Sequence, residues 1–355
     1  MREFGRREVL ALAGKSAGAL AAASLMPGMF GAGAMAQSED TIRFAYQPGF
    51  AYGLFYVAQA KGWFKEAGVS LDPMTVFTNG PIQIDAVING DLDATVQGFV
   101  PLLTRAAGNQ PVRIIDVVDN SGRTYAVVGT KAIDGVPGLK GKTVGVNRGS
   151  NYDYFLGEAL TKFGMSIADL NIVNFGDPVK AQAAFVAGQV DAIVPITTSR
   201  EAILQQRANA KVIFSATQFT EGPNPSKAPF AIYDLLATTD KALSKHHDGF
   251  VKLMQVFHTR VYDYITSEKT QSAAIDDIYD WQKTVIKAEV TKEQILANIK
   301  NFEFYNKEKA RQVVASGELQ TFLEKISKFL VDNKLLPSAP DVSKIIDAGP
   351  AKAMG

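Results

Sequence analysis

Polar and aromatic residues follow several predicted strands in this sequence, at positions where side chains can contact a ligand. Gln47, Phe50 and Tyr52 come after one strand, and Gln97 and Asn120 end or follow two others. Amide side chains offer both a donor and an acceptor, and the two rings could form an aromatic wall. The alternatives are that Phe50 and Tyr52 pack on the next helix and that Gln97 hydrogen-bonds a helix start.

A second group lies at a predicted helix start, where free amide N–H groups favour anions. Ser150 and Asn151 come just before a helix that begins near Tyr152, and one of them is expected to cap it. Asp153 could pair with the amine of a zwitterion, or it could only complement the helix dipole. Arg148 lies close enough in sequence to bind an anion, as does Arg123 from another loop.

Asp234 lies on a later strand and could face either a cleft or solvent. The complete set of predicted ligand-binding residues is Gln47, Phe50, Tyr52, Asn79, Gln97, Asn120, Ser150, Asn151, Tyr152, Asp153, Thr197 and Asp234.

Catalytic, metal and cofactor sites are not predicted. The chain has no cysteine, and its three histidines (His246, His247 and His258) all fall in the C-terminal part, away from the candidate residues. The Gly-Lys-Thr of residues 141–143 lacks the spacing of a nucleotide-binding loop and leads into a strand. We therefore expect no catalytic residue, no metal and no cofactor.

The elements that must position these residues alternate between strand and helix. Strands are predicted at 41–48, 69–76, 93–96 and 112–118, with a helix over 53–68 and others near 81 and 101. This alternation predicts a parallel sheet that is covered on both faces.

An internal repeat indicates that this winding occurs twice. Phe77–Val96 and Phe175–Val194 align without a gap at an offset of 98 residues. In each copy a strand ends at Phe, a helix ends at Gly, and an Asp leads into the next strand. A separate first strand at 143–147 and a return strand at 228–240 complete the prediction of two similar domains.

The predicted fold is therefore α/β, with two similar Rossmann-like lobes joined by two hinge strands and followed by C-terminal helices. The first lobe is predicted to comprise residues 41–126 and 229–355, and the second 127–228. Ligands of open α/β sheets bind beyond the carboxyl ends of the strands, so the two lobes would close on a ligand between them.

Residues 45–72 and 77–103, with the segment LKGKTVGVNRGSNYDYFL at 139–156, resemble the nitrate/sulfonate/taurine-type substrate-binding proteins of ABC importers. The resemblance implies a type II periplasmic binding protein without catalysis, which works transiently with a permease. That family also includes binders of pyrimidine-like compounds. Thr197 and Thr198 stand where relatives often carry a tryptophan-containing loop, so the sequence departs there from the usual sulfonate pocket.

Residues 1–36 are predicted to be a cleaved export signal of the twin-arginine type. Arg6 and Arg7 precede an Ala- and Gly-rich apolar run that ends in Ala34-Met35-Ala36. Cleavage after Ala36 would release the protein into the periplasm. The formal net charge of +1 argues against a nucleic-acid partner, and we expect a monomer.

Three functions remain open from the sequence. The first is a solute receptor for an importer, with a sulfonate- or taurine-like anion or zwitterion as cargo, or alternatively a pyrimidine-like or aromatic heterocyclic compound. The second is an enzyme on the same fold, and the third is a partner that presents its ligand to a membrane receptor.

Overall fold

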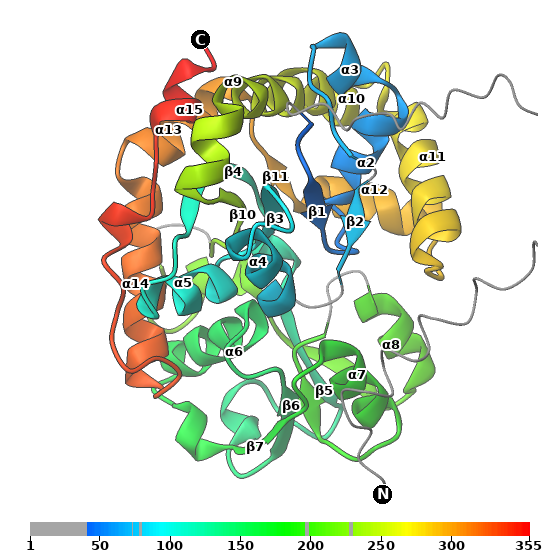
Figure 1. The fold of residues 1–355 in the computed structure, drawn as a ribbon. Coiled ribbons are helices and arrows are strands. Elements are labelled where there is room, and N and C mark those ends of the chain that lie inside the picture. Colours follow the sequence, from blue (N-terminus) through cyan, green and yellow to red (C-terminus); the bar gives the residue numbers. More distant parts are fainter. Residues whose placement is uncertain (1–40, 73, 78–79, 196–198, 227–229) are drawn as a thin grey trace, which may run out of the picture. The chain divides into compact units, whose positions relative to one another are not determined.

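The computed structural model describes residues 41–355 apart from 73, 78–79, 196–198 and 227–229. The predicted export signal and the binding candidates Asn79 and Thr197 lie outside the described residues. Figure 1 shows the arrangement of the elements of residues 41–355.

Two sheets carry the fold, and they confirm the predicted α/β class. The first has the strand order β11-β4-β10-β3-β1-β2, and the second β7-β6-β8-β5-β9. The strands of the first sheet are β11 (Glu303–Phe304), β4 (Arg113–Asn120), β10 (Tyr233–Thr238), β3 (Ala94–Gly98), β1 (Phe44–Tyr46) and β2 (Thr75–Val76). Those of the second are β7 (Asn171–Asn174), β6 (Thr143–Val146), β8 (Ala192–Ile193), β5 (Ala126–Thr130) and β9 (Ala210–Ser215).

Helices follow most strands and then fill the C-terminal part of the chain. The helices before the C-terminal part are α2 (Gly53–Ala60), α3 (Trp63–Glu66), α4 (Gly80–Ile88), α5 (Phe99–Ala107), α6 (Asn151–Lys162), α7 (Pro178–Val186) and α8 (Arg200–Gln206). The C-terminal helices are α9 (Asp240–Val256), α10 (Tyr262–Thr266), α11 (Gln271–Trp281), α12 (Lys292–Asn301), α13 (Lys307–Ala315), α14 (Glu318–Asp332) and α15 (Gly349–Ala353). Within the described part of the chain, none of these helices combines the length and apolarity needed to span a membrane.

The two sheets share one topology and one register, as the sequence repeat predicts. The pair Phe44↔Ala94 of β1 and β3 corresponds to Val144↔Ala192 of β6 and β8. In each sheet one strand, β1 or β6, pairs in parallel on both sides, and the next strand but one is antiparallel: β10 in the first sheet and β5 in the second. The two copies of the repeat therefore lie in separate sheets.

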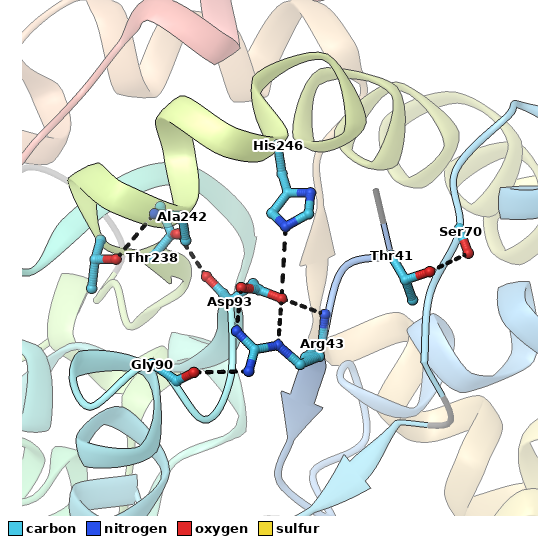
Figure 2. Close-up of polar contacts among 9 residues, drawn as sticks. Thr41, Arg43, Ser70, Gly90, Asp93, Thr238, Ala242 and His246 are labelled. Atoms are coloured by element: carbon cyan, nitrogen blue, oxygen red, sulfur yellow. Dashed lines mark hydrogen bonds and ion pairs between the residues drawn. The ribbon is translucent and has the colours of Figure 1, made fainter. Parts of the chain in front are cut away.

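The repeated aspartate has a structural role in both halves, because its carboxylate accepts a hydrogen bond from a backbone N–H at or just before the start of a neighbouring parallel strand, β1 or β6. Asp93 Oδ2 accepts from the Arg43 N–H at 2.8 Å, and Asp191 Oδ2 accepts from the Thr143 N–H at 2.9 Å. The two backbones also bond in return, since the Asp93 N–H donates to the Arg43 carbonyl. Figure 2 shows that Asp93 also accepts hydrogen bonds from the Arg43 guanidinium and lies near His246.

Three predicted elements are shorter than their sequence patterns suggest. The helix predicted over 53–68 is divided into α2 and α3, because Gly62 adopts a left-handed conformation with φ of 76° between them. The strand predicted over 69–76 contributes only β2 and an isolated bridge at Leu71, since its partner β1 is itself three residues long. The predicted strand over 228–240 narrows to β10.

The C-terminal helices are attached to the first sheet through a buried histidine. His258 lies in a π-helical turn between α9 and α10, and its Nε2 is 2.6 Å from Asp116 Oδ2 of β4. Its Nδ1 is 2.9 Å from the Tyr305 carbonyl. Because both nitrogens face acceptors, the ring is a cation here, and the Asp116 carboxylate raises the pKa of His258 against the opposing effect of burial.

The hydrogen bonds of the repeated aspartate predict that its loss destabilises both halves, and the first half more than the second. Asp191→Ala leaves the Thr143 N–H without its acceptor and is expected to lower the free energy of unfolding by about 1–2 kcal/mol. Asp93→Ala also removes the partner of the Arg43 guanidinium and is expected to cost about 3 kcal/mol. Urea unfolding measures both, with the exposed Asp134→Ala as the control. Equal losses in all three variants would contradict this role.

Candidate functional site

Four directly opposed residues form a row across the ends of neighbouring strands in the first sheet. Asp234 of β10 lies opposite Gly98 of β3 on one side and opposite Asp119 of β4 on the other. Phe304 of β11 lies opposite Asp119. Directly opposed residues point to the same face of a sheet, so these four positions line one surface. We call them the strand-end row.

The centre of the row is a pair of buried carboxyl groups. Asp119 is 0% and Asp234 6% exposed, and the Tyr52 hydroxyl donates to Asp234 Oδ1 at 2.5 Å. Burial raises the pKa of Asp119 well above its usual range, and the neighbouring Asp234 adds to that rise. Burial also raises the pKa of Asp234 to about 6, which hydrogen bonds from Tyr52, Asp119 and Ser121 partly oppose. Two adjacent buried carboxyls in this setting hold a proton between them.

Aromatic side chains of the first half surround the acidic end of the row. The Phe50 ring lies 5.2 Å from Phe302 and 6.3 Å from Phe304, measured between ring centroids. Phe50 is 2% and Tyr52 9% exposed. Both rings are therefore buried, and Phe302 and Phe304 of the C-terminal part pack on Phe50.

The second half contributes an amide and two further rings near the same row. An ideal Cβ at Gly98 would lie 2.4 Å from Asn151 Nδ2, so the absence of a side chain at Gly98 leaves room for the Asn151 amide. The rings of Tyr125 and Tyr152 are 5.5 Å apart. The Asp234 carboxylate raises the pKa of both tyrosines, in addition to the larger effect of burial. Asn151, Tyr152 and Asp234 are thus brought together as predicted candidates.

The start of α6 differs from the prediction. Ser150 occupies the N-cap position, but its hydroxyl donates to the Asn147 carbonyl at 2.6 Å and makes no capping bond. Asp153, 0% exposed, accepts instead from the Gly149 N–H at 3.0 Å and pairs with Arg148 Nη1 at 2.9 Å. One of Ser150 and Asn151 was expected to cap the helix, but the residue at the N-cap, Ser150, makes no capping hydrogen bond. Arg148 is already paired with a carboxylate.

The chain crosses between the sheets next to the strand-end row, and Asn120 connects the two crossing segments. Its Oδ1 accepts from the N–H groups of Gly122 and Ile232, both at 3.0 Å. Its Nδ2 lies 3.3 Å from Glu303 Oε2. A Cβ at Gly122 would lie 2.2 Å from the Phe230 carbonyl oxygen, so the segments are in close backbone contact. These bonds occupy the amide that was predicted to face a ligand.

The remaining candidates, Gln47 and Gln97, lie on the other face of the first sheet. Gln47 Nε2 donates to Gln83 Oε1 at 3.0 Å, beneath the start of α4. Gln97 pairs with Leu235, one position away from the row, and is 0% exposed. Among the described residues, neither polar atom of the Gln97 amide has a hydrogen-bond partner. The helix-start bond expected as its alternative role is absent there.

Sequence reasoning missed three groups at this site: Asp119, Tyr125 and the pair Phe302 and Phe304. Asp119 lies two residues beyond Ile114–Val117 of the same buried strand, which was predicted to end at 118. A continuation of the predicted strand by one residue would have placed a carboxyl at its end. A surface hollow of about 500 Å³ lies elsewhere, lined by α2, α3 and residues 68–71. Among the described residues, no group of three or more potential ligands is placed to hold a metal ion.

A family comparison matches residues 50–272 of this chain to the family described as NMT1/THI5 like. A protein of Brucella abortus strain 2308, described only in general terms as a binding protein, is 37% identical over 136 residues. That match covers 38% of this chain and 41% of the relative. The taurine-binding periplasmic protein of Escherichia coli K12 is 31% identical over 136 residues, which is 38% of this chain and 42% of that protein.

Solved structures of periplasmic binding proteins share the fold. The alkanesulfonate-binding protein SsuA of Xanthomonas axonopodis pv. citri, bound to MOPS, has a TM-score of 0.67 at 17% identity, covering 87% of this chain and 98% of that chain. The nitrate-binding protein NrtA of Synechocystis has a TM-score of 0.66 at 12% identity, covering 89% and 88%. At these identities the likeness concerns the fold alone.

The contact between the crossing segments predicts a large cost for one methyl group. Gly122→Ala places a Cβ against the Phe230 backbone, which cannot rotate away, and is expected to lower the free energy of unfolding by about 2–3 kcal/mol. Gly108→Ala is the control, because its Cβ would lie 3.4 Å from the nearest atom. Denaturant unfolding measures both, and similar values would contradict the proposed crowding.

The unpaired amide of Gln97 predicts that its replacement by an apolar side chain does not lower the free energy of unfolding. Gln97→Leu removes a buried polar group without a partner, and the protein is expected to be at least as stable as the native one. Gln83→Leu is the matched control on α4. It removes an acceptor of Gln47 and a donor to the Val96 carbonyl, and is expected to cost about 1–3 kcal/mol. A loss of stability in Gln97→Leu as large as in Gln83→Leu would refute this assignment.

Proposed function

The chain belongs to the NMT1/THI5-like family, and from this premise we propose that it is the solute-binding component of an ABC importer. Its structural neighbours include proteins named for binding alkanesulfonate and nitrate, and a sequence relative is named for binding taurine. The proposal includes export to the periplasm, action as a monomer and transient contact with a permease, without catalysis.

The observation that carries this proposal is the composition of the strand-end row. It places carboxyls of β4 and β10 close to an amide and a ring from the start of α6 and to the Tyr125 ring just before β5, next to both crossing segments. A ligand held there would contact both halves at once and would favour the closed state over the open one. Entry requires the halves to separate, because the carboxyls are buried in this structure.

The charges around the row favour a pyrimidine-like or aromatic heterocyclic cargo over a sulfonate-like anion. Arg148, a candidate for binding a sulfonate, is paired with Asp153. Asp119 and Asp234 would repel an anion and would accept hydrogen bonds from N–H groups. The three tyrosine rings Tyr52, Tyr125 and Tyr152 suit a flat or apolar partner. We therefore propose a small nitrogen-bearing organic molecule, with pyrimidine-like and aromatic heterocycles as the leading class.

A taurine-like zwitterion is the second candidate, since the Escherichia coli relative is named for taurine. Its ammonium group could contact the carboxyl pair. A purely anionic sulfonate would lack that contact, so its binding would speak against the leading class and for the alternative.

The proposed function is tested by a thermal-shift screen of the full chain. The compounds are amino- and hydroxypyrimidines, aromatic amines, taurine and simple alkanesulfonates. A ligand at 100 times its dissociation constant stabilises the folded state by about 2.7 kcal/mol, which raises the melting temperature by several degrees. Nitrogen heterocycles are expected to give this shift. Conversion of any hit to a product during incubation would instead support an enzyme.

Tyr152→Ala provides a site-specific check on any hit. The half-buried ring of Tyr152 lies beside Tyr125 near the row, and its loss is expected to weaken binding at least tenfold while the protein remains folded. Tyr279→Ala on α11 removes another half-buried ring and is the matched control. Calorimetric titration compares the two, and equal losses would place the ligand elsewhere.

A further inference from the structure

The carboxyl pair of Asp119 and Asp234 lacks a cationic partner within the described part of the chain. The Tyr52 hydroxyl donates to Asp234, which lies directly opposite Asp119, and no lysine, arginine or histidine contributes to the pKa shift of either group. Both Asp119 oxygens are buried and have no hydrogen-bond partner among the described residues. The other buried aspartates of the described residues differ: Asp93 faces Arg43, Asp116 faces His258, and Asp153 faces Arg148.

A buried pair of this kind cannot carry two negative charges at low cost. Coulomb repulsion between directly opposed carboxylates and the loss of hydration both favour one shared proton. Two carboxylates are acceptors only, so a hydrogen bond between the opposed groups requires one proton. Asp119 is the group that holds it, because its buried oxygens have no hydrogen-bond partner among the described residues, while Asp234 accepts a bond from the Tyr52 hydroxyl.

The groups that face the pair do not compete for this proton near neutral pH. They are Tyr52 from the loop before α2, Tyr125 after the first crossing segment, Tyr152 from α6 and Tyr305 after β11, together with the Ser121 hydroxyl. Burial raises the pKa of all four tyrosines, so they stay neutral. Glu303 is exposed and contacts Asn120 instead.

We infer that Asp119 and Asp234 recognise an organic cation, which enters the site in exchange for the proton that the two carboxyls share. The inference rests on the proposed solute-binding function and makes its cargo more specific: an amine or amidine that is protonated when bound. The tyrosine rings beside the pair would support such a cation, because aromatic faces attract positive charge. A neutral ring of the same shape would leave the shared proton on the carboxyls and would bind more weakly.

The exchange balances in charge and in atoms. Before binding, the pair carries one proton and one negative charge; afterwards, it carries two negative charges and one bound ammonium or amidinium group. The O–H bond of the protonated carboxyl breaks, its proton passes to water, and no other covalent bond changes. The net charge of the buried site therefore stays the same, which avoids the cost of adding an uncompensated charge.

This exchange fixes the sign of the pH dependence. Protons compete with the cation for the pair, so affinity falls as pH falls. While the free pair holds its proton, one proton is released per ligand, and the dissociation constant decreases about tenfold per unit rise in pH. A pair that had only a structural role would give no proton release on binding.

The test uses the full chain with matched probes that differ in charge but little in shape. Benzylamine is compared with benzyl alcohol, and benzamidine with benzamide, alongside aminopyrimidines, taurine and an alkanesulfonate. Calorimetry in two buffers of different ionisation enthalpy, at pH 6 and pH 7, counts the protons that are released. The cationic member of each pair is expected to bind at least tenfold more tightly and to release close to one proton.

Asp119→Asn keeps the shape of the pair and removes the exchangeable proton. It is expected to weaken cation binding at least tenfold and to abolish proton release. Asp234→Asn is the second variant should the first fold poorly, with the same expectation. Glu303→Gln is the control, since it removes a nearby carboxylate outside the pair, and both readouts should remain unchanged.

The outcomes separate this inference from the proposed function. Tight binding of neutral heterocycles or sulfonates, unchanged in Asp119→Asn and without proton release, would overturn the inference and leave the receptor function standing. The absence of a thermal shift with every compound, in the native protein at both pH values, would overturn both. Cation binding that persists in both aspartate variants would overturn the inference alone.

Discussion

The position of β10 between β3 and β4 is the constraint on which the site depends. The chain leaves the first sheet after β4, builds the second sheet and returns as β10, which pairs antiparallel with both neighbours. Because β10 begins where β3 and β4 end, its second residue, Asp234, lies opposite Gly98 and Asp119. The same step brings both crossing segments to the edge that carries the carboxyls. The placement of β10 therefore determines both the proposed ligand site and the position of the crossing segments.

This arrangement concentrates an energetic cost at the row and offsets it elsewhere in the first sheet. Two opposed carboxyls lower the stability of a strand pair unless a proton or a cation lies between them. The far end of β10 is held firmly, since the Thr238 hydroxyl donates to the Asp93 carbonyl at 2.7 Å. Asp93 is itself bonded to Arg43 of the neighbouring chain segment. Sites that bind ligands often carry such local cost within a well-paired framework.

Local signals predicted most of the fold, and long-range packing decided the rest. The repeat could be found because Gly90 and Gly188 both take the left-handed conformation that ends a helix, and each precedes a structural aspartate by three residues. Asp234 was a candidate from its place on the predicted return strand, and Tyr152 from its place at a helix start. The burial of Phe50 depends on Phe302, some 250 residues away, which no local pattern indicates. The lost cap at Ser150 likewise reflects a competing local acceptor rather than a poor sequence signal.

The two halves contribute different kinds of contact, and this difference bears on specificity. Asp119 and Asp234 lie on strands that are paired on both sides, so the positions of their carboxyls are fixed by backbone hydrogen bonds. Asn151 and Tyr152 lie in the first turn of a helix, where side chains can adjust without altering a sheet. In the proposed site, recognition of charge would thus rest on the strands of the first sheet, and recognition of shape on the start of α6. A relative could change the shape of its cargo by substitutions at the start of α6, whereas a change in the charge of its cargo would require altering β4 or β10.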